Sequence, residues 1–273
     1  MKRNPLLLLP LLLLCGCALT AQEPAYTNPV GMEFVLIKPG SLVVGQYQPT
    51  VGKPDRSNTN RQWLPDSVYA VAEEMARNAA MPGFEVTIER PYYLGKFEVT
   101  QAQWQQVMGS NPSFFQGDKV PDDAKQHPVE NVTWEDAQAF VKTLNTLDKK
   151  HTYRLPTEFE WEYAARAGAK DDIPWAEMNK VAVKGGNTTS AIGQKQPNAW
   201  GMYDMLGNVW EWVQDYYNEK IFADPVPPRS GKQHVLKGAS FTGDAKNATY
   251  KTHAAGPGNG FDVGLRVVME ANK

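Results

Sequence analysis

The chain has 273 residues, 42% of them hydrophobic and 21% charged, which is enough to bury one substantial core. Its 28 basic and 30 acidic residues nearly balance and leave a net charge of −2. Binding to nucleic acid or to an anionic membrane surface depends on clustered Lys and Arg, so this composition argues against both kinds of partner. The composition predicts a single globular domain.

The first residues have the pattern of a targeting segment. A basic start, Met1-Lys2-Arg3, precedes a Leu-rich stretch at 6–14 that is too short to span a bilayer, which takes ~20 helical residues. We therefore expect residues 1–21 to be a signal peptide and residues 22–273 to form the mature domain. The expected location is the periplasm of a Gram-negative bacterium.

Two cleavage sites compete in this segment. The sequence Leu14-Cys15-Gly16-Cys17 resembles a bacterial lipobox, and cleavage there would leave a lipid anchor on Cys17 as the expected membrane contact. Cleavage after Ala21 would leave no anchor. Both cysteines of the chain lie in this segment, so the mature domain is predicted to have neither a disulfide framework nor a thiolate metal site.

The mature domain is predicted to begin with strands. Residues 31–37 have an alternating, β-branched pattern and lead into a Pro39-Gly40 turn, and strand character returns at 84–88 and 92–97. Residues 46–81 break the pattern with Pro, Gly and Asn. We expect them to form an insertion, either a solvated surface excursion or a lid over a cleft.

Three threonines mark predicted helix starts. Each is followed three positions later by a side chain that can complete a capping box, because it can reach back to the backbone of the threonine. The pairs are Thr100 with Gln103, Thr133 with Asp136, and Thr157 with Glu160. From residue 185 onward the chain is rich in Gly and Asn, so we expect the C-terminal half to consist largely of loops.

Several motifs resemble those of the formylglycine-generating enzyme, or sulfatase-modifying factor, family. The most specific is RLPTE at 154–158, followed by EWE at 160–162. GMYDMLGNVWEW at 201–212 and VLKGASF at 235–241 extend the resemblance over most of the mature chain. It implies a single α+β domain with the C-type-lectin-like fold of this family, with two packed helices, small twisted sheets and much irregular structure.

The resemblance also has a chemical consequence. In this family two cysteines just past the motif at 235–241 carry out a copper-dependent oxidation of a substrate cysteine. The matching positions here are Gly243 and Ala248. Formylglycine-generating oxidation is therefore not expected. No copper is expected either, because only a thiolate would hold Cu(I) in that place.

Calcium is the cofactor that the resemblance implies. In the family one structural Ca²⁺ lies in the loop that corresponds to 207–212, and the matching side-chain ligands here are Asn208 and Glu211. The alternative is that Asn208 caps a turn and Glu211 pairs with an Arg. A second calcium site of the family is not expected, because residues 181–197 are shortened and lack acidic side chains.

Polar residues stand where the family holds its cysteines and contacts its substrate. The candidate substrate-binding residues are Ser240, Asn247, Tyr250 and Arg266. Acid–base chemistry needs a carboxylate or an imidazole with a shifted pKa. The candidate catalytic residues are Asp244 and His253, with Glu158 and Glu160 at a helix start. For each of these side chains the alternative is that it is a solvent-exposed polar group or that it caps a helix.

Two functions are compatible with these residues. The first is a cysteine-independent, oxidoreductase-type tailoring enzyme that matures a peptide-derived substrate in the periplasm, similar to the family branch that matures the pyoverdine siderophore chromophore. The alternative is a non-catalytic module that binds a peptide or an exported protein, similar to the branch that regulates a type VI secretion kinase. We favour the first, because a retained cleft with Asp244 and His253 suits chemistry.

Other chemistries lack their motifs. The four His residues do not have the spacing of a metal centre. The chain has no phosphate-binding P-loop and no nucleophile elbow.

Overall fold

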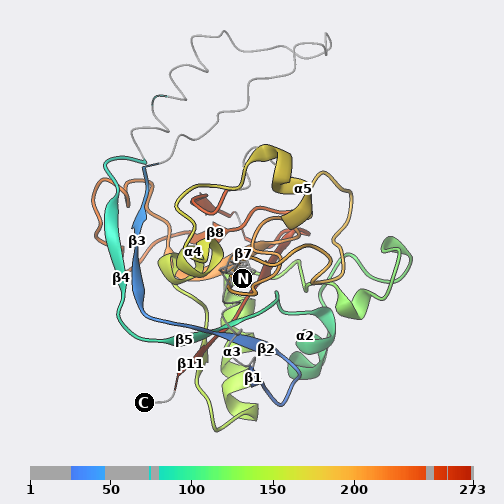
Figure 1. Cartoon of the computed structure of the whole chain (residues 1–273). Helices are drawn as coiled ribbons and strands as arrows, with labels where there is room; N and C mark the ends of the chain where they lie inside the picture. Colours follow the sequence, from blue (N-terminus) through green and yellow to red (C-terminus); the bar gives the residue numbers. More distant parts are fainter. Residues whose placement is uncertain (1–25, 47–73, 75–79, 244–248, 257, 272–273) are drawn as a thin grey trace, which may run out of the picture.

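The central sheet brings together both ends of the domain. In the computed structural model, which describes residues 26–46, 74, 80–243, 249–256 and 258–271, this sheet has five antiparallel strands (Figure 1). Their order is β1 (Tyr26–Thr27), β2 (Glu33–Ile37), β5 (Tyr92–Gly95), β11 (Val268–Glu270) and β6 (Tyr153–Arg154). The last strand of the chain thus lies between β5 and β6, with Val268 opposite both Leu94 and Arg154.

A second sheet carries the segments of the C-terminal half. Its order is β10 (Val263–Leu265), β7 (Trp210–Tyr216), β8 (His234–Lys237) and β9 (Ala254–Ala255). The pair β10 and β7 is parallel, while the other pairs are antiparallel. A separate two-stranded ribbon, β3 (Gly40–Val44) with β4 (Phe84–Ile88), stands at one side of the molecule (Figure 1).

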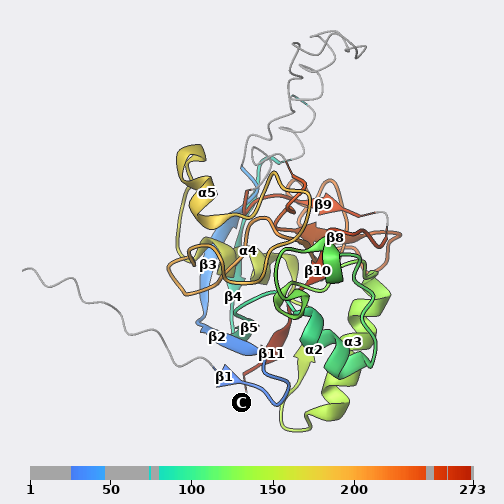
Figure 2. The same ribbon diagram turned by 90° about the vertical axis from the view of Figure 1, so that its right-hand side faces the viewer.

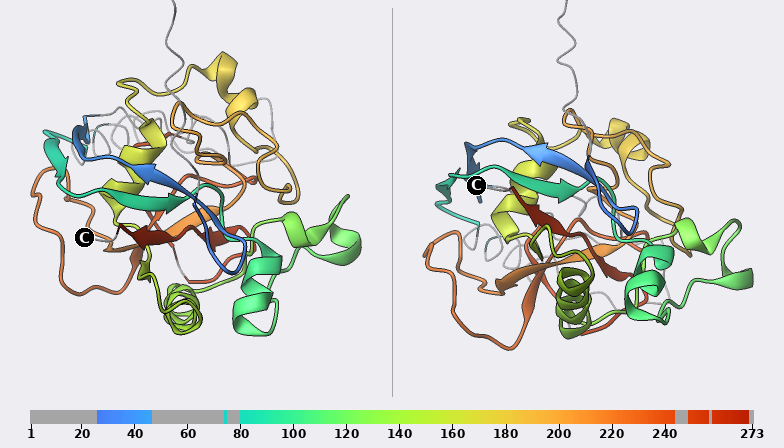
Figure 3. Two further views of the ribbon diagram at one scale, coloured as in Figure 1. Left: turned by 60° about the horizontal axis from the view of Figure 1, so that its bottom comes forward. Right: turned by 90° about the horizontal axis from the view of Figure 1, so that it is seen from below.

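Two helices pack side by side below the five-stranded sheet, as Figures 2 and 3 show. They are α2 (Gln101–Met108) and α3 (Trp134–Leu147). The rings of Trp104 and Phe140 stack between them, with centroids 4.9 Å apart. The apolar residues at helical spacing on α3 are the ones that are buried, so amphipathic patterning explains this layer.

The helix α4 (Glu158–Arg166) packs against β7 and β8 of the second sheet. Shorter helical segments are α5 (Met178–Val181) and the 3₁₀ turns η1 (Gly117–Lys119), η2 (Ala124–Gln126) and η3 (Trp175–Glu177). All three expected capping boxes are present at α2, α3 and α4, with both hydrogen bonds formed in each. The threonines therefore start the helices as predicted.

The α+β architecture with much irregular structure is confirmed, with small corrections to the boundaries. The strand expected at 92–97 ends at Gly95, whose N–H bonds to Val267 O. The signal peptide and most of the insertion at 46–81 lie outside the described residues. No helix in the described part of the chain is long and apolar enough to cross a membrane.

Candidate functional site

The loop after β8 places two hydroxyl groups beside one carboxylate. Gly238 and Ala239 have φ angles of 90° and 65°, and this left-handed backbone turns the chain away from β8. The Asp262 Oδ2 atom then accepts hydrogen bonds from Ser240 Oγ at 2.7 Å and from Thr242 Oγ1 at 3.1 Å. Ser240 is buried and Thr242 is exposed, so the cluster runs from the surface into the domain.

Four phenylalanine rings lie next to this hydroxyl–carboxylate cluster. They come from three distant segments and form what we call the aromatic patch: Phe114, Phe115, Phe241 and Phe261. Their centroids are 5.0–6.4 Å apart. Phe115 and Phe241 are buried, but Phe114 and Phe261 are 49% and 52% exposed. Exposed, adjacent aromatic rings are unfavourable in water and are typical of a binding surface.

Charged groups border the patch. Lys119 Nζ lies 3.5 Å from the centroid of the Phe114 ring, in a cation–π contact. Below it, Glu130 is fully buried, and its Oε1 atom accepts a hydrogen bond from Phe115 N at 2.8 Å. Its other oxygen, Oε2, has no hydrogen-bond partner among the described residues. Burial raises the pKa of Glu130 to about 7, and the negative charge of Asp262 adds to the rise.

No sequence pattern pointed to the aromatic patch, and Glu130 was not among the predicted site residues. The available signal was a carboxylate between two valines, in Val129-Glu130-Asn131-Val132, at the entry to a helix. A charged residue between buried valines is unusual and needs a partner or a raised pKa.

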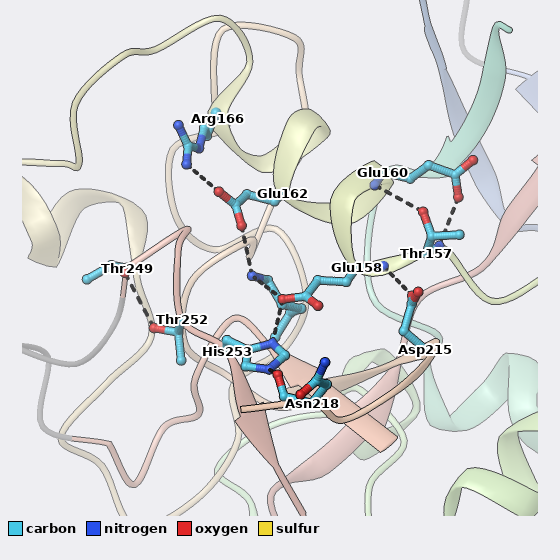
Figure 4. A network of polar contacts seen from close by, with 11 residues as sticks. Thr157, Glu158, Glu160, Glu162, Arg166, Asp215, Asn218, Thr249, Thr252 and His253 are labelled. Carbon is cyan, nitrogen blue, oxygen red and sulfur yellow. Dashed lines mark hydrogen bonds and ion pairs between the residues drawn. The ribbon is translucent and has the colours of Figure 1, made fainter. Parts of the chain in front are cut away.

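The predicted catalytic residue His253 lies elsewhere, against the N-terminal end of α4 (Figure 4). Its Nδ1 atom is 2.7 Å from Glu158 Oε1 and its Nε2 atom is 3.0 Å from Asn218 O. The ring stacks on Tyr217, with centroids 4.6 Å apart, and the side chain is only 4% exposed. Both ring nitrogens are therefore occupied inside the protein.

The contact of His253 with Glu158 continues into a line of alternating charges. Lys237 Nζ lies 3.7 Å from Glu158 Oε1 and 3.1 Å from Glu162 Oε2, and Glu162 also pairs with Arg166. Burial would raise the pKa of Glu158, but His253 and Lys237 outweigh burial and hold that pKa below its usual value. Each buried charge has a partner, which is what a stable buried network requires.

The remaining candidate catalytic residues do not join a common site. Glu160 accepts a hydrogen bond from Thr157 N at 2.8 Å and pairs with Arg154 at 2.6 Å, so it caps α4 and points away from His253 (Figure 4). Asp244 lies outside the described residues. The structure thus brings Glu158 and His253 together, in a position closed to solvent rather than in a cleft.

The candidate substrate-binding residues are spread over three places. Ser240 belongs to the hydroxyl–carboxylate cluster beside the aromatic patch. Tyr250 is buried, and burial raises its pKa to about 12. Arg266 is fully buried and bonds to Glu211, Gly95 O and Tyr203 O. Asn247 lies outside the described residues.

The two predicted calcium ligands are engaged by protein groups. The side chain of Asn208 bonds to Glu98 at 2.8 Å and accepts from Ser190 N at 3.0 Å. The Glu211 carboxylate accepts hydrogen bonds from Arg266 and, at 2.6 Å, from Trp161 Nε1. This is the alternative considered for Glu211, while the expectation that Asn208 and Glu211 bind Ca²⁺ stays a prediction.

A carboxylate oxygen without a partner among the described residues lies just before this loop, on Asp204. This residue is buried with a φ of 53°, its Oδ1 atom has no partner among the described residues, and it lines a cavity of about 70 Å³. Burial raises the pKa values of Glu98 and Asp204, and the neighbouring carboxylates raise them further. Three buried carboxylates thus face one guanidinium, so an added cation would balance the charge.

A divalent cation at this loop stays a prediction, with Asp204 as an additional candidate ligand. No three His, Cys, Asp or Glu side chains of the described residues are arranged to hold a metal by themselves. Backbone carbonyl groups would therefore have to complete the oxygen ligands, which Ca²⁺ accepts readily.

Similar proteins show where this chain belongs. LppX of Paenibacillus barcinonensis, a chaperone protein, is 32% identical over 235 residues, which cover 65% of this chain and 79% of LppX. The formylglycine-generating enzyme of Mus musculus is 34% identical over 168 residues, which cover 50% of this chain but only 42% of that enzyme.

Two solved structures share the fold. PvdO from Pseudomonas aeruginosa has a TM-score of 0.69 at 23% identity and covers 91% of this chain and 98% of its own. Treponema denticola variable protein 1 has a TM-score of 0.69 at 25% identity and covers 91% and 99%.

The motifs that suggested this family lie at the positions just described. RLPTE leads into α4, and the Trp-Glu-Trp motif forms the start of β7 with Glu211 in the core. A family model described as the sulfatase-modifying factor enzyme 1-like domain matches residues 21–271. The chain belongs to this FGE-sulfatase family.

Proposed function

We propose that this protein binds a segment of an exported partner protein at the aromatic patch. The observation that carries the proposal is the pair of half-exposed rings, Phe114 and Phe261, above a buried aromatic layer. Rigid aromatic side chains lose little conformational entropy on binding, so they serve well as anchors for an apolar peptide side chain. Lys119 and Asp262 at the border provide polar contacts for the peptide backbone.

Three further observations support binding over the family's oxidation. Gly243 and Ala248 replace the cysteine pair. His253, the predicted acid–base residue, has both nitrogens bonded and is almost fully buried. The relative LppX is a chaperone protein, and a chaperone works by holding another protein. Regulation of an exported partner, such as a component of a type VI secretion kinase pathway, would use the same surface.

One observation favours a second candidate, the tailoring of a peptide-derived substrate such as a siderophore chromophore. One carboxylate oxygen of Glu130 has no partner in the described part of the chain, and burial raises the pKa of Glu130 to about 7. A group that titrates near neutral pH is suited to proton transfer, and it lies under the patch where a substrate would bind. Both functions belong to the periplasm, where the leader at 1–21 is expected to direct the protein.

Site-directed photo-crosslinking in cells tests the binding proposal. A photoreactive phenylalanine analogue is placed at Phe114 or at Phe261, and at Leu147 as a control, because Leu147 is 55% exposed on α3. We expect one discrete protein adduct from the first two positions and none from the third. The double variant Phe114→Ala/Phe261→Ala should keep its melting temperature but fail to complement a gene deletion.

Other outcomes would decide against the proposal. Equal crosslinking at Leu147 would mean that the partner does not bind specifically at the aromatic patch. Full complementation by the double alanine variant would contradict it, and failure of Glu130→Gln alone to complement would favour tailoring.

A further inference from the structure

A cavity lies on the other side of the molecule from the aromatic patch. It has a volume of about 560 Å³, within the range of small-molecule pockets, which is roughly 300–1,000 Å³. Its walls are the β3–β4 ribbon and the C-terminal end of α4. Figure 1 shows this ribbon at one edge of the molecule and the loop after α2, which carries Phe114, at the opposite edge.

Local packing fixes the two walls. The Tyr163 ring on α4 lies so close to Gly40 that a Cβ atom there would come within 2.2 Å of its hydroxyl. Phe159, one turn earlier, packs edge-on against Phe84 of β4 with centroids 5.5 Å apart. The helix ends at Arg166, and the next residue, Ala167, has a φ of 46° and turns the chain along the cavity. The cavity is therefore part of the packed fold.

Arg166 lies in the wall of this cavity. Its side chain is 9% exposed, and one terminal nitrogen pairs with Glu162. Its Nε atom, however, is buried and has no hydrogen-bond acceptor in the described part of the chain. A buried N–H without an acceptor costs about 1–3 kcal/mol, so this atom indicates that an acceptor is missing.

Two lysines add positive charge on the same side. Lys170 follows α4 in the chain and is exposed. Lys251 comes from a distant segment, and its Nζ atom lies 3.6 Å from Asp172 Oδ2, which holds it near the end of α4. Of the two carboxylates that line the cavity, Glu85 lies on the ribbon and accepts a hydrogen bond from Ser41 at 2.8 Å, and Asp171 is exposed.

We propose that this cavity binds a small molecule that carries a carboxylate or phosphate group. The oxyanion would bind the guanidinium of Arg166, whose Nε–H has no acceptor among the described residues, and the charges of Lys170 and Lys251 would attract it. Guanidinium and oxyanion form short, charge-assisted hydrogen bonds that are stronger than neutral ones. The rest of the ligand would lie against Leu42 and Val43 on β3. This site is separate from the patch and does not depend on its function.

Calorimetric titration tests the site with two probes, inorganic phosphate and acetate, each at constant ionic strength. The two arms distinguish a phosphate ligand from a carboxylate ligand. We expect saturable binding of at least one probe to the full-length protein, and about tenfold weaker binding in Lys170→Gln and in Lys251→Gln, because each removes one charge-assisted contact. Lys142→Gln on the exposed face of α3 is the matched control and should bind like the wild type.

The lysine variants keep the test independent of folding. Arg166 also neutralises buried Glu162, so its replacement can unfold the domain, whereas Lys170 is exposed. The proposal is overturned if neither probe gives saturable binding. It is also overturned if Lys170→Gln and Lys251→Gln bind as tightly as Lys142→Gln.

Discussion

At the scale of single residues, burial decides what a titratable side chain does. The His253 ring is bonded at both nitrogens and stacked on Tyr217, and it is a hydrogen-bond partner of the buried Glu158. We expect His253→Gln to lower the free energy of unfolding by about 1–3 kcal/mol, because a buried carboxylate loses a partner. Urea denaturation measures this, with Lys142→Gln as control. A variant of unchanged stability that no longer complements would instead show a catalytic role.

Glu130 predicts a dependence of stability on pH. Folding raises its pKa from 4.5 to about 7, so the folded state holds a proton that the unfolded chain releases. The stabilisation is therefore complete below pH 4.5 and is lost as the pH rises through 7. Glu130→Gln should gain about 3 kcal/mol relative to the wild type between pH 4.5 and 8, as a shift of 2.5 pKa units implies.

Paired urea denaturation of the wild type and of Glu130→Gln at several pH values gives this difference directly. Burial also raises the pKa of Asp215 to about 6, but Asp215 is present in both proteins, so its effect on stability cancels in the difference. Glu219→Gln on the surface is the control. A stability difference that stays constant with pH would mean that Glu130 is ionised in the folded state.

The sequence predicted single residues well where their surroundings are local in the chain. The capping partners lie three positions apart, and all were found. The aromatic patch joins residues 114, 241 and 261, and no spacing rule connects such distant segments. For His253 the residue type suggested chemistry, but no local pattern could show its contact with Glu158, 95 residues away.

At the scale of elements, α4 depends on its first turn. Thr157 Oγ1 accepts a hydrogen bond from Glu160 N. The Glu160 carboxylate in turn accepts a hydrogen bond from Thr157 N and also pairs with Arg154. We expect Thr157→Ala to lower stability by about 1 kcal/mol, the usual cost of losing an N-cap. Thr146→Ala, at an exposed position of α3, is the matched control and should change stability by less than about 0.5 kcal/mol. Equal effects in thermal unfolding would contradict the importance of the cap.

Strands were predicted less completely than helices, for a physical reason. The strands at 33–37 and 84–88 are long enough to show a pattern, and they were found. The strands β1, β6 and β9 have two residues each, too few for any periodicity. The parallel pairing of β10 with β7 joins residues 53 positions apart, so it could not be inferred from either segment alone.

At the scale of the whole molecule, the core ion pair connects the two sheets. Arg266 lies between β10 of the second sheet and β11 of the first, and it pairs with Glu211 on β7 of the second. Arg266 also bonds to Gly95 O at the end of β5. The pairing of Arg266 with Glu211 of the Trp-Glu-Trp motif therefore belongs to the fold, which explains why the resemblance gave the fold correctly while leaving the function open.

The same region predicts a response to calcium. Glu98, Asp204 and Glu211 are buried around Arg266, and Asp204 Oδ1 has no partner among the described residues. If Ca²⁺ binds here in the folded state only, calcium at a hundred times its dissociation constant should stabilise the domain by about 2.7 kcal/mol. Thermal unfolding in calcium and in EGTA measures the effect. Asp204→Asn should abolish it, whereas Asp171→Asn, an exposed carboxylate, should not.

The choice of variant matters for this test. Glu211→Gln would also weaken the pair with Arg266, so a lower melting temperature would not separate calcium binding from core damage. Asp204→Asn keeps the shape, still accepts from Gly193 N and removes only the charge. Equal melting temperatures in calcium and in EGTA would mean that protons, rather than a cation, balance the charge of these carboxylates. Burial raises the pKa values of Glu98 and Asp204, so the stability of the domain should then fall as the pH rises.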